Sequence, residues 1–359
     1  MIKVYQKYLI SKFISKFILI SFVFLSLIFI LGLLEEISFL GNSKKNSFLP
    51  YLLTALNAPI TLFEIFPFIF LLTTQYLFYE LFKNDELDLF KKNGLSNLKI
   101  IKIILILSFI IGIFNILIYY NFASTLKSTY SGIKNNLSND NKYLAMVNDN
   151  GLWIKENIDD HIYIIKAENI NENYLQEIVL YKFDKKFNLI SIIQSNKIDI
   201  SSTNWLIYEP HITENNVSKK NLTHLNFKSN FNTKIINSLF SNNSTQNLIQ
   251  LFKVKNNYQN LGYDTKDISI HMLKVFSMPL NYSFLTIFAA VIMFNMNNRK
   301  SLITHLMIGV SISVVIYYFN YIFNILGAKG KIPISLSVFF PMLILFLISI
   351  ISLVRVNEK

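Results

Sequence analysis

Long apolar runs separated by short polar segments make up most of the chain. A membrane-spanning helix needs roughly 20 consecutive apolar residues, and runs of that length lie near residues 13–34, 58–82, 100–122, 275–296, 302–326 and 334–354. The first run follows several lysines, as in a signal peptide, but it is longer than usual and lacks a small-residue cleavage site. The pattern therefore predicts six membrane-spanning helices, the first of them uncleaved.

The segment 124–270, between the third and fourth runs, has a different pattern. Asn, Ser, Lys and Asp become frequent, and apolar residues occur in short alternating groups that are typical of half-buried strands. The clearest groups are 151–156, 161–166, 176–182 and 189–193, with a turn at 184–188 and a short helix at 244–252. Regular short strands joined by polar turns favour an antiparallel sandwich or open barrel.

Together these patterns predict an α-helical membrane protein with six transmembrane helices, three on each side of an inserted antiparallel β domain. The expected boundaries are 1–123, 124–270 and 271–359. Because Lys and Arg collect in cytoplasmic loops, both termini are expected in the cytoplasm and the β domain in the periplasm. Besides the basic N-terminal tail, the residues behind this orientation are Lys83, Lys91, Lys92, Lys99, Arg299, Lys300, Arg355 and Lys359.

Composition narrows the function classes. The chain is 52% hydrophobic, carries a formal net charge of +12 and has no cysteine. Its lysines are scattered and form no basic stripe, so nucleic acid is not an expected partner. The absence of cysteine excludes disulfides, a thiolate zinc site and a cysteine nucleophile.

Catalytic and cofactor motifs are missing as well. The segment 327–332 is the nearest approach to a glycine-rich phosphate-binding loop, but its spacing is wrong and no hydroxyl residue follows Lys331. The five histidines lack metal-ligand spacing. Charged residues within the spans, Glu64, Glu80 and Lys102, are interpreted as side chains that extend towards the membrane interface. We therefore expect no catalytic residue, no metal and no cofactor.

The loop between the second and third spans is the most informative polar segment. Asn84 or Asp85 can cap a short helix, Leu87 and Phe90 fall at helical spacing, and Gly94 suits a left-handed stop. Two interpretations remain open: an ordinary interfacial helix, or a coupling helix that inserts into a separate ATPase.

This loop resembles the LptF/LptG permeases of lipopolysaccharide export, in which an acidic residue, Glu and Leu precede an apolar pair and a glycine. Here the pattern runs from Asp85-Glu86-Leu87 to Gly94. Further similarity to this family, in the same order along the chain, lies at Pro59, Phe66-Pro67, Gly151-Leu-Trp153, Lys274 with Pro279, and Ile332-Pro333 with Pro341. The Gly-Leu-Trp segment is more similar to the LptG branch than to the LptF branch.

The resemblance implies a transport subunit that does not itself hydrolyse ATP. Its expected partners are an LptF-type permease subunit, an LptB ATPase dimer, LptC, and lipopolysaccharide as the transported lipid. The family implies a lipid cavity lined chiefly by helices one and five, and a periplasmic domain with a β-jellyroll-like fold. It also implies that Glu86, Leu87, Phe90 and Gly94 couple the permease to the ATPase.

The headgroup contacts are less well matched. Ser124 stands where the family usually has proline, and Glu35 and Glu36 replace basic residues at the outer end of the first helix. Four nearby lysines can supply positive charge to lipid phosphates instead: Lys44, Lys45, Lys127 and Lys134. The alternative is that they are solvated loop lysines, which contribute little.

Other readings of the whole chain stay open. The paralogous LptF subunit has the same topology, and a polytopic membrane sensor or a permease for another lipid fits the six spans. A lipoprotein-release permease places its outer domain after the first helix, whereas three spans precede the domain here. A sensor would need a cytoplasmic output domain, and the predicted cytoplasmic segments are too short to form one.

Overall fold

The computed structural model describes residues 3–40, 48–137, 152–158, 161–171, 173–185, 187–214, 217–219, 223–229, 231–233, 236, 243–260, 264–295 and 302–357. These residues form two compact units. One unit combines Met1–Lys127 with Lys266–Lys359, and the other is Ser128–Thr265. The chain thus leaves the helical unit once and returns to it.

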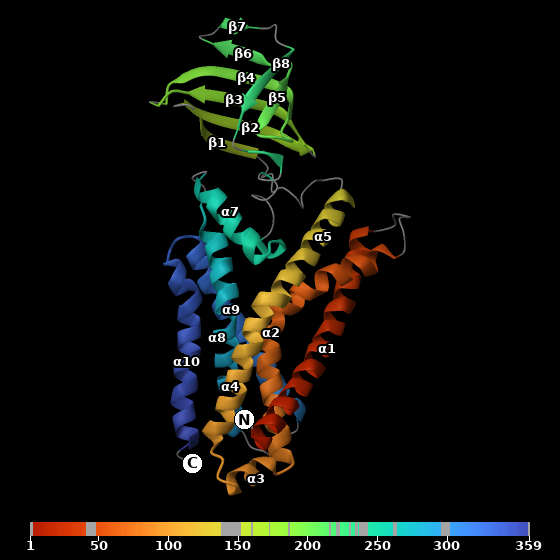
Figure 1. Ribbon diagram of the computed structural model, residues 1–359, viewed down its shortest axis with the longest axis vertical. Coiled ribbons are helices and arrows are strands. Elements are labelled where there is room, and N and C mark those ends of the chain that lie inside the picture. The colour runs from red at the N-terminus through yellow and green to blue at the C-terminus, as the bar shows by residue number, and fades with distance from the viewer. Residues whose placement is uncertain are drawn as a thin grey trace. The chain divides into compact units, whose positions relative to one another are not determined.

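The first unit is a bundle of long helices (Figure 1). Before the inserted unit come α1 (Val4–Leu40), α2 (Leu49–Lys83), the short α3 (Glu86–Lys92), α4 (Asn97–Phe114), the π-helical segment η1 (Asn115–Tyr120) and the start of α5 (Asn121–Leu137). After it come α8 (Lys266–Asn295), α9 (Leu302–Ala328) and α10 (Ile334–Asn357). Within the described residues, six helices are long and apolar enough to cross a membrane, which confirms the predicted number.

The helices extend beyond the apolar runs that predicted them. The first begins at Val4, and the third continues through η1 and α5 to Leu137. The extension of the third helix is amphipathic, because α5 combines polar and apolar faces. Hydropathy alone detects only the part of a helix that must face lipid, so it makes such helices shorter than they are.

Close helix contacts hold the bundle together at small residues. The hydroxyl groups of Ser108 on α4 and Thr286 on α8 are 2.9 Å apart. A Cβ atom at Gly112 would lie 2.6 Å from the Cα atom of Pro279, so only glycine allows α4 and α8 to approach this closely. At Gly32 of α1, a Cβ atom would lie 2.8 Å from the methyl group of Thr54 on α2.

The second unit contains an antiparallel sheet, as predicted. Its strands are β1 (Leu152–Ile158), β2 (His161–Asn171), β3 (Tyr174–Phe183), β4 (Leu189–Asp199), β5 (Asn204–Tyr208), β6 (His211–Glu214), β7 (Val217–Lys219) and β8 (His224–Lys228). Their order in the described part of the sheet is β1-β2-β3-β4-β5-β8, with β6 paired to β4 and β7 paired to β6 (Figure 1). The strand β4 therefore pairs with β3 along one edge and with β5 and β6 in succession along the other.

The predicted turn between β3 and β4 is confirmed. The backbone N–H of Asp184 donates to the carbonyl of Asn188 at 3.0 Å, and its carboxylate accepts the Asn188 backbone N–H at 2.8 Å. Phe187 adopts φ 64° within this turn. The Asp side chain thus replaces the backbone bonds that the turn interrupts.

One apolar core supports the sheet, centred on the fully buried Trp205. The Trp205 indole N–H donates to the carbonyl of Phe231 at 2.8 Å, and its ring lies 6.0 Å from that of Phe227. Burying this side chain therefore leaves its polar atom satisfied.

The predicted helix at 244–252 starts later than expected. A short 3-10 segment, η2 (Asn243–Thr245), precedes α7 (Leu248–Asn260). The Asn247 side chain accepts the backbone N–H of Gln250, and the Gln250 side chain accepts the backbone N–H of Asn247, both at 2.9 Å. This reciprocal capping box fixes the helix start at Leu248.

Candidate functional site

The short helix α3 follows α2 after a tight turn. Asp85 occupies the position before the helix, but it has φ 55° and its side chain makes no capping bond. A side-chain cap normally requires an extended backbone at this position, so the left-handed conformation explains why the predicted cap does not form. At the other end Gly94 has φ 78°, and its N–H donates to the Lys91 carbonyl at 2.9 Å. The predicted glycine stop is therefore present.

Glu86, the first residue of α3, is bound by the first membrane helix. The Lys12 ammonium lies 2.7 Å from one Glu86 carboxylate oxygen and 2.8 Å from the other. The Tyr8 hydroxyl donates to the same carboxylate at 2.9 Å, and the Asn84 amide donates to it at 3.3 Å. Burial would raise the pKa of Glu86, but the bonds from Lys12, Tyr8 and Asn84 outweigh burial and hold this pKa below its usual value.

Lys12 contacts a second carboxylate as well. Its ammonium lies 3.2 Å from Glu80 near the end of α2, and Glu80 also pairs with Lys16 one turn further along α1. Only 13% of the Lys12 side chain and 19% of the Glu86 side chain are exposed. We call Tyr8, Lys12, Glu80 and Glu86 the α1–α3 charge cluster, because they tie three helices together.

The apolar residues of α3 divide between two faces. Leu87 is 2% exposed, and Phe90 packs edge-on against Tyr8 with ring centres 6.3 Å apart. Leu89 is 56% exposed, and Asp88 is exposed beside it. Leu87 and Phe90 therefore hold α3 against the chain itself, whereas Leu89 and Asp88 lie on its open face.

The expected headgroup lysines are placed only in part. Lys127 donates to the side-chain oxygen of Asn57 at 2.7 Å. Lys134 is 4% exposed, donates to the Tyr130 hydroxyl at 2.6 Å and lies 5.1 Å from the centre of that ring. Lys44 and Lys45 lie outside the described residues. The structure thus gives Lys127 and Lys134 partners within the chain.

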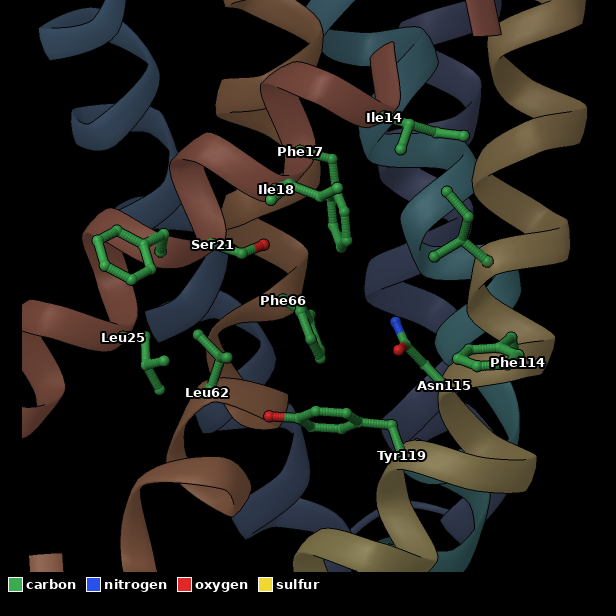
Figure 2. Close-up of a pocket in the computed structure, with 12 residues that line it drawn as sticks. Ile14, Phe17, Ile18, Ser21, Leu25, Leu62, Phe66, Phe114, Asn115 and Tyr119 are labelled. Carbon is green, nitrogen blue, oxygen red and sulfur yellow. The ribbon is translucent and has the colours of Figure 1, made fainter. Parts of the chain in front are cut away.

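A pocket of about 490 Å³ opens between α1, α2 and the junction of α4 with η1 (Figure 2). Its floor includes the buried Leu62 and Phe66 of α2, and its rim includes the exposed Phe22 and Phe114. The wall is predominantly apolar. Within the part of the chain that the structure describes, α9 supplies no residue to this pocket, although the family resemblance implies a cavity lined chiefly by helices one and five.

Asn115 brings a polar group to this apolar pocket. It is 4% exposed, and its amide nitrogen has no hydrogen-bond partner among the described residues. Figure 2 shows this amide and the Ser21 hydroxyl directed into the space between the helices. Asn115 is the first residue of η1, and single π-helical turns within α-helices often occur at functional sites.

Two sets of residues in these sites were not identified from the sequence. Tyr8, Lys12 and Lys16 recur every four residues and so share one face of α1, which could have indicated a partner for the acidic residues near α3. Asn115 interrupts an apolar run, which is a weaker signal. Among the described residues, no group of three or more His, Asp or Glu side chains is placed to hold a metal ion.

Comparison with known protein families gives a match to nearly the whole chain. A family model described as lipopolysaccharide export system permease LptF/LptG matches residues 7–355. This range includes both helical segments and the inserted sheet. Among curated proteins, none matches the chain at a significant level.

Proposed function

The chain belongs to the LptF/LptG family of lipopolysaccharide export permeases, and from this premise we propose that it is one of two permease subunits of an ATP-driven exporter. In this proposal the exporter extracts lipopolysaccharide from the inner membrane and passes it to a periplasmic bridge. The subunit is of the LptG type, because of the Gly151-Leu-Trp153 segment, and pairs with an LptF-type subunit.

The proposal rests on the way in which α3 is held against the helical unit while one of its faces stays open. A seven-residue helix is too short to be stable in water by itself, yet here Glu86 and Phe90 fix it to α1 and the Leu87 side chain is buried. Its open face presents Leu89 and Asp88. A firmly held helix with an apolar side chain on its open face is suited to transmit force from a partner ATPase.

We assign the coupling residues accordingly. Glu86, Leu87 and Phe90 fix α3, Gly94 ends it, and Leu89 supplies the contact with an LptB-type ATPase dimer. Hydrolysis of ATP takes place in that partner, and LptC packs beside the permease. These roles are supported by the placement of the side chains and by membership of the family.

The lipid path is proposed to run beside α1. The pocket between α1, α2 and η1 has the apolar lining and the volume that suit part of a lipid. Lys127 and Lys134, together with Lys44 and Lys45, supply positive charge for the lipid phosphates. A phosphate offers Lys127 a charge-assisted hydrogen bond, which is stronger than its bond to the neutral Asn57 side chain.

Purification of the complex tests the function. The chain, extracted in a mild detergent with its native partners, should retain lipopolysaccharide and an ATPase subunit, both identified by mass spectrometry. As a control, the same extraction should be made from cells that express an unrelated six-helix membrane protein. Recovery of a different lipid with no ATPase, at the same chain yield, would contradict the proposal.

The orientation gives a second prediction. With both termini in the cytoplasm, the turn 184–188 faces the periplasm, so Asn188→Cys should react with a membrane-impermeant maleimide in intact spheroplasts. The chain has no cysteine of its own, so the label reports this position alone. A cysteine in place of the exposed Lys92 of α3 is the control and should react only after the membrane is broken. The reverse result would place the sheet in the cytoplasm.

A further inference from the structure

Lys12 on α1 links α1 to two other helices of the helical unit. It is the residue of the α1–α3 charge cluster whose ammonium contacts carboxylates from both α2 and α3. We propose that Lys12 is a positioning residue that carries the displacement of α3 to α1, and through α1 to the wall of the pocket. The inference rests on the proposed function, because it requires that a partner moves α3.

The contact has the geometry needed to transmit movement. Three donors, from Lys12, Tyr8 and Asn84, converge on the Glu86 carboxylate. Charge-assisted bonds of this kind are short and directional, so a shift of α3 changes their energy steeply. Phe90 adds an apolar contact to Tyr8 on the same helix. The start of α3 is therefore joined to α1 at residues that lie one turn apart.

The helix α1 connects this contact to the pocket. It runs without a break from Val4 to Leu40 and contains no proline. Ile14, Phe17, Ile18 and Ser21 of α1 line the pocket, and Ser21 lies about 14 Å along the helix from Lys12 at 1.5 Å per residue. A rigid helix of this length moves as one body, so displacement at Lys12 reaches the pocket wall.

The second carboxylate makes the contact reversible. As α3 moves and its bonds to Lys12 lengthen, Lys12 keeps Glu80 at 3.2 Å as a second partner. An ammonium in a partly buried site is costly when it is left without a partner, and Glu80 removes that cost in the displaced state. The arrangement thus allows two discrete positions of α3, which a coupling element requires.

Lys12→Met tests the inference, with Lys16→Met as the matched control. Methionine keeps an unbranched side chain of comparable length but removes both ion pairs of Lys12. Lys16 lies one turn away on the same helix and pairs with Glu80 without contacting α3. In the reconstituted complex, Lys12→Met should keep hydrolysing ATP while the lipopolysaccharide exported per ATP falls by roughly 5- to 150-fold, the usual range of coupling between sites. Lys16→Met should stay near wild type.

Spin labels supply a readout that does not depend on export. Cysteines at the exposed positions Lys7 and Lys92 report the distance between α1 and α3, which should be narrowly distributed in wild type and broad in Lys12→Met. Cysteines at the exposed Leu27 of α1 and Ile110 of α4 report the pocket wall. Their distance should change when a non-hydrolysable ATP analogue is added to the wild-type complex, and should not change in Lys12→Met.

The outcomes separate this inference from the function on which it rests. If the wild-type complex exports no lipopolysaccharide, the proposed function fails, while the label pair at 7 and 92 still shows whether Lys12 holds α3. A label distribution in Lys12→Met equal to that of wild type would overturn the inference. So would undiminished coupling in that variant. Lys12→Arg, which keeps the charge and can bind both carboxylates, should recover most of the export, and its failure to do so would also count against the inference.

Discussion

Glu86→Lys is expected to abolish lipopolysaccharide export, while the chain still assembles with its partners. The substitution replaces a carboxylate that lies 2.7 Å from the Lys12 ammonium with a second ammonium. Attraction becomes repulsion in a partly buried site, and like charges juxtaposed in this way cost several kcal/mol. Release of α3 from α1 then separates ATP hydrolysis from export. Both rates should be measured in the reconstituted complex.

Two further variants grade this effect. Glu86→Ala removes the bonds without adding repulsion, and hydrogen bonds to a charged group contribute about 1.5–3 kcal/mol each at most, so export should fall less than in Glu86→Lys. Asp88→Ala changes an exposed carboxylate on the open face of α3 and leaves the bonds from Glu86 to α1 in place, so a loss of export in this variant would come from the contact with the ATPase. Wild-type export per ATP in Glu86→Lys would rule out any coupling role for this residue.

A charge reversal in a second position identifies the partner of Glu86. If the ion pair within the chain is what matters, Lys12→Glu should restore part of the export to Glu86→Lys, since that pair is re-formed with opposite signs. The restoration is incomplete because the new carboxylate also meets Glu80, which lies 3.2 Å from the Lys12 ammonium. If Glu86 also meets a basic residue of the ATPase, the compensating reversal must be made there. The two rescues therefore distinguish an internal contact from a contact across subunits.

Trp205→Ala should destabilise the sheet unit by about 3–5 kcal/mol, the usual cost of removing a large buried aromatic side chain. Trp205 is fully buried in the core of the sheet, and its loss also leaves the Phe231 carbonyl without the indole N–H that bonds it at 2.8 Å. A loss of this size is a large fraction of the free energy of unfolding of an ordinary domain, about 5–15 kcal/mol. Hydrogen exchange of the strands β3 to β5 in the full-length protein should accelerate strongly.

The only other tryptophan of the chain provides the control. Trp153 belongs to the same sheet but is 49% exposed, so Trp153→Ala should change exchange of these strands very little. Equal acceleration of hydrogen exchange in the two variants would show that loss of either tryptophan disturbs the unit. The burial of Trp205 would then not be what stabilises the sheet.

The general architecture could be predicted from the sequence because its signals are local. Apolar runs predicted the six helices, and the alternation of apolar and polar residues predicted the sheet. Gly94, which has a positive φ in the structure, predicted the end of α3. The limits of the helices could not be predicted as well. Val4–Leu40 includes lysines that hydropathy excludes, because two of them, Lys12 and Lys16, are paired with acidic side chains in the folded chain.

The candidate site was predictable in its residues but not in their partners. The sequence singled out Glu86 from a short motif, yet its main partner, Lys12, is 74 positions earlier in the chain. Such a pairing depends on how α1 and α2 pack, and no local pattern specifies that packing. Asn115 was not predicted either, because a single polar residue within an apolar run does not indicate the π-helical turn that begins there.

The close crossing of α1 and α2 at Gly32 and Thr54 gives the first helix a pivot. Lys12 lies about 30 Å from this crossing and Ser21 about 16 Å from it, at 1.5 Å per residue. A swing of the part of α1 before Gly32 therefore moves Ser21 by about half as much as Lys12. Beyond Gly32 the remaining turns of α1 swing in the opposite sense. The α1 residues that line the pocket all lie on the Lys12 side of Gly32, so a pull at Lys12 moves them in one direction and moves those nearest Lys12 furthest. An alanine at position 32, whose Cβ atom would lie 2.8 Å from the Thr54 methyl group, would force Thr54 or the two helices to shift at the pivot.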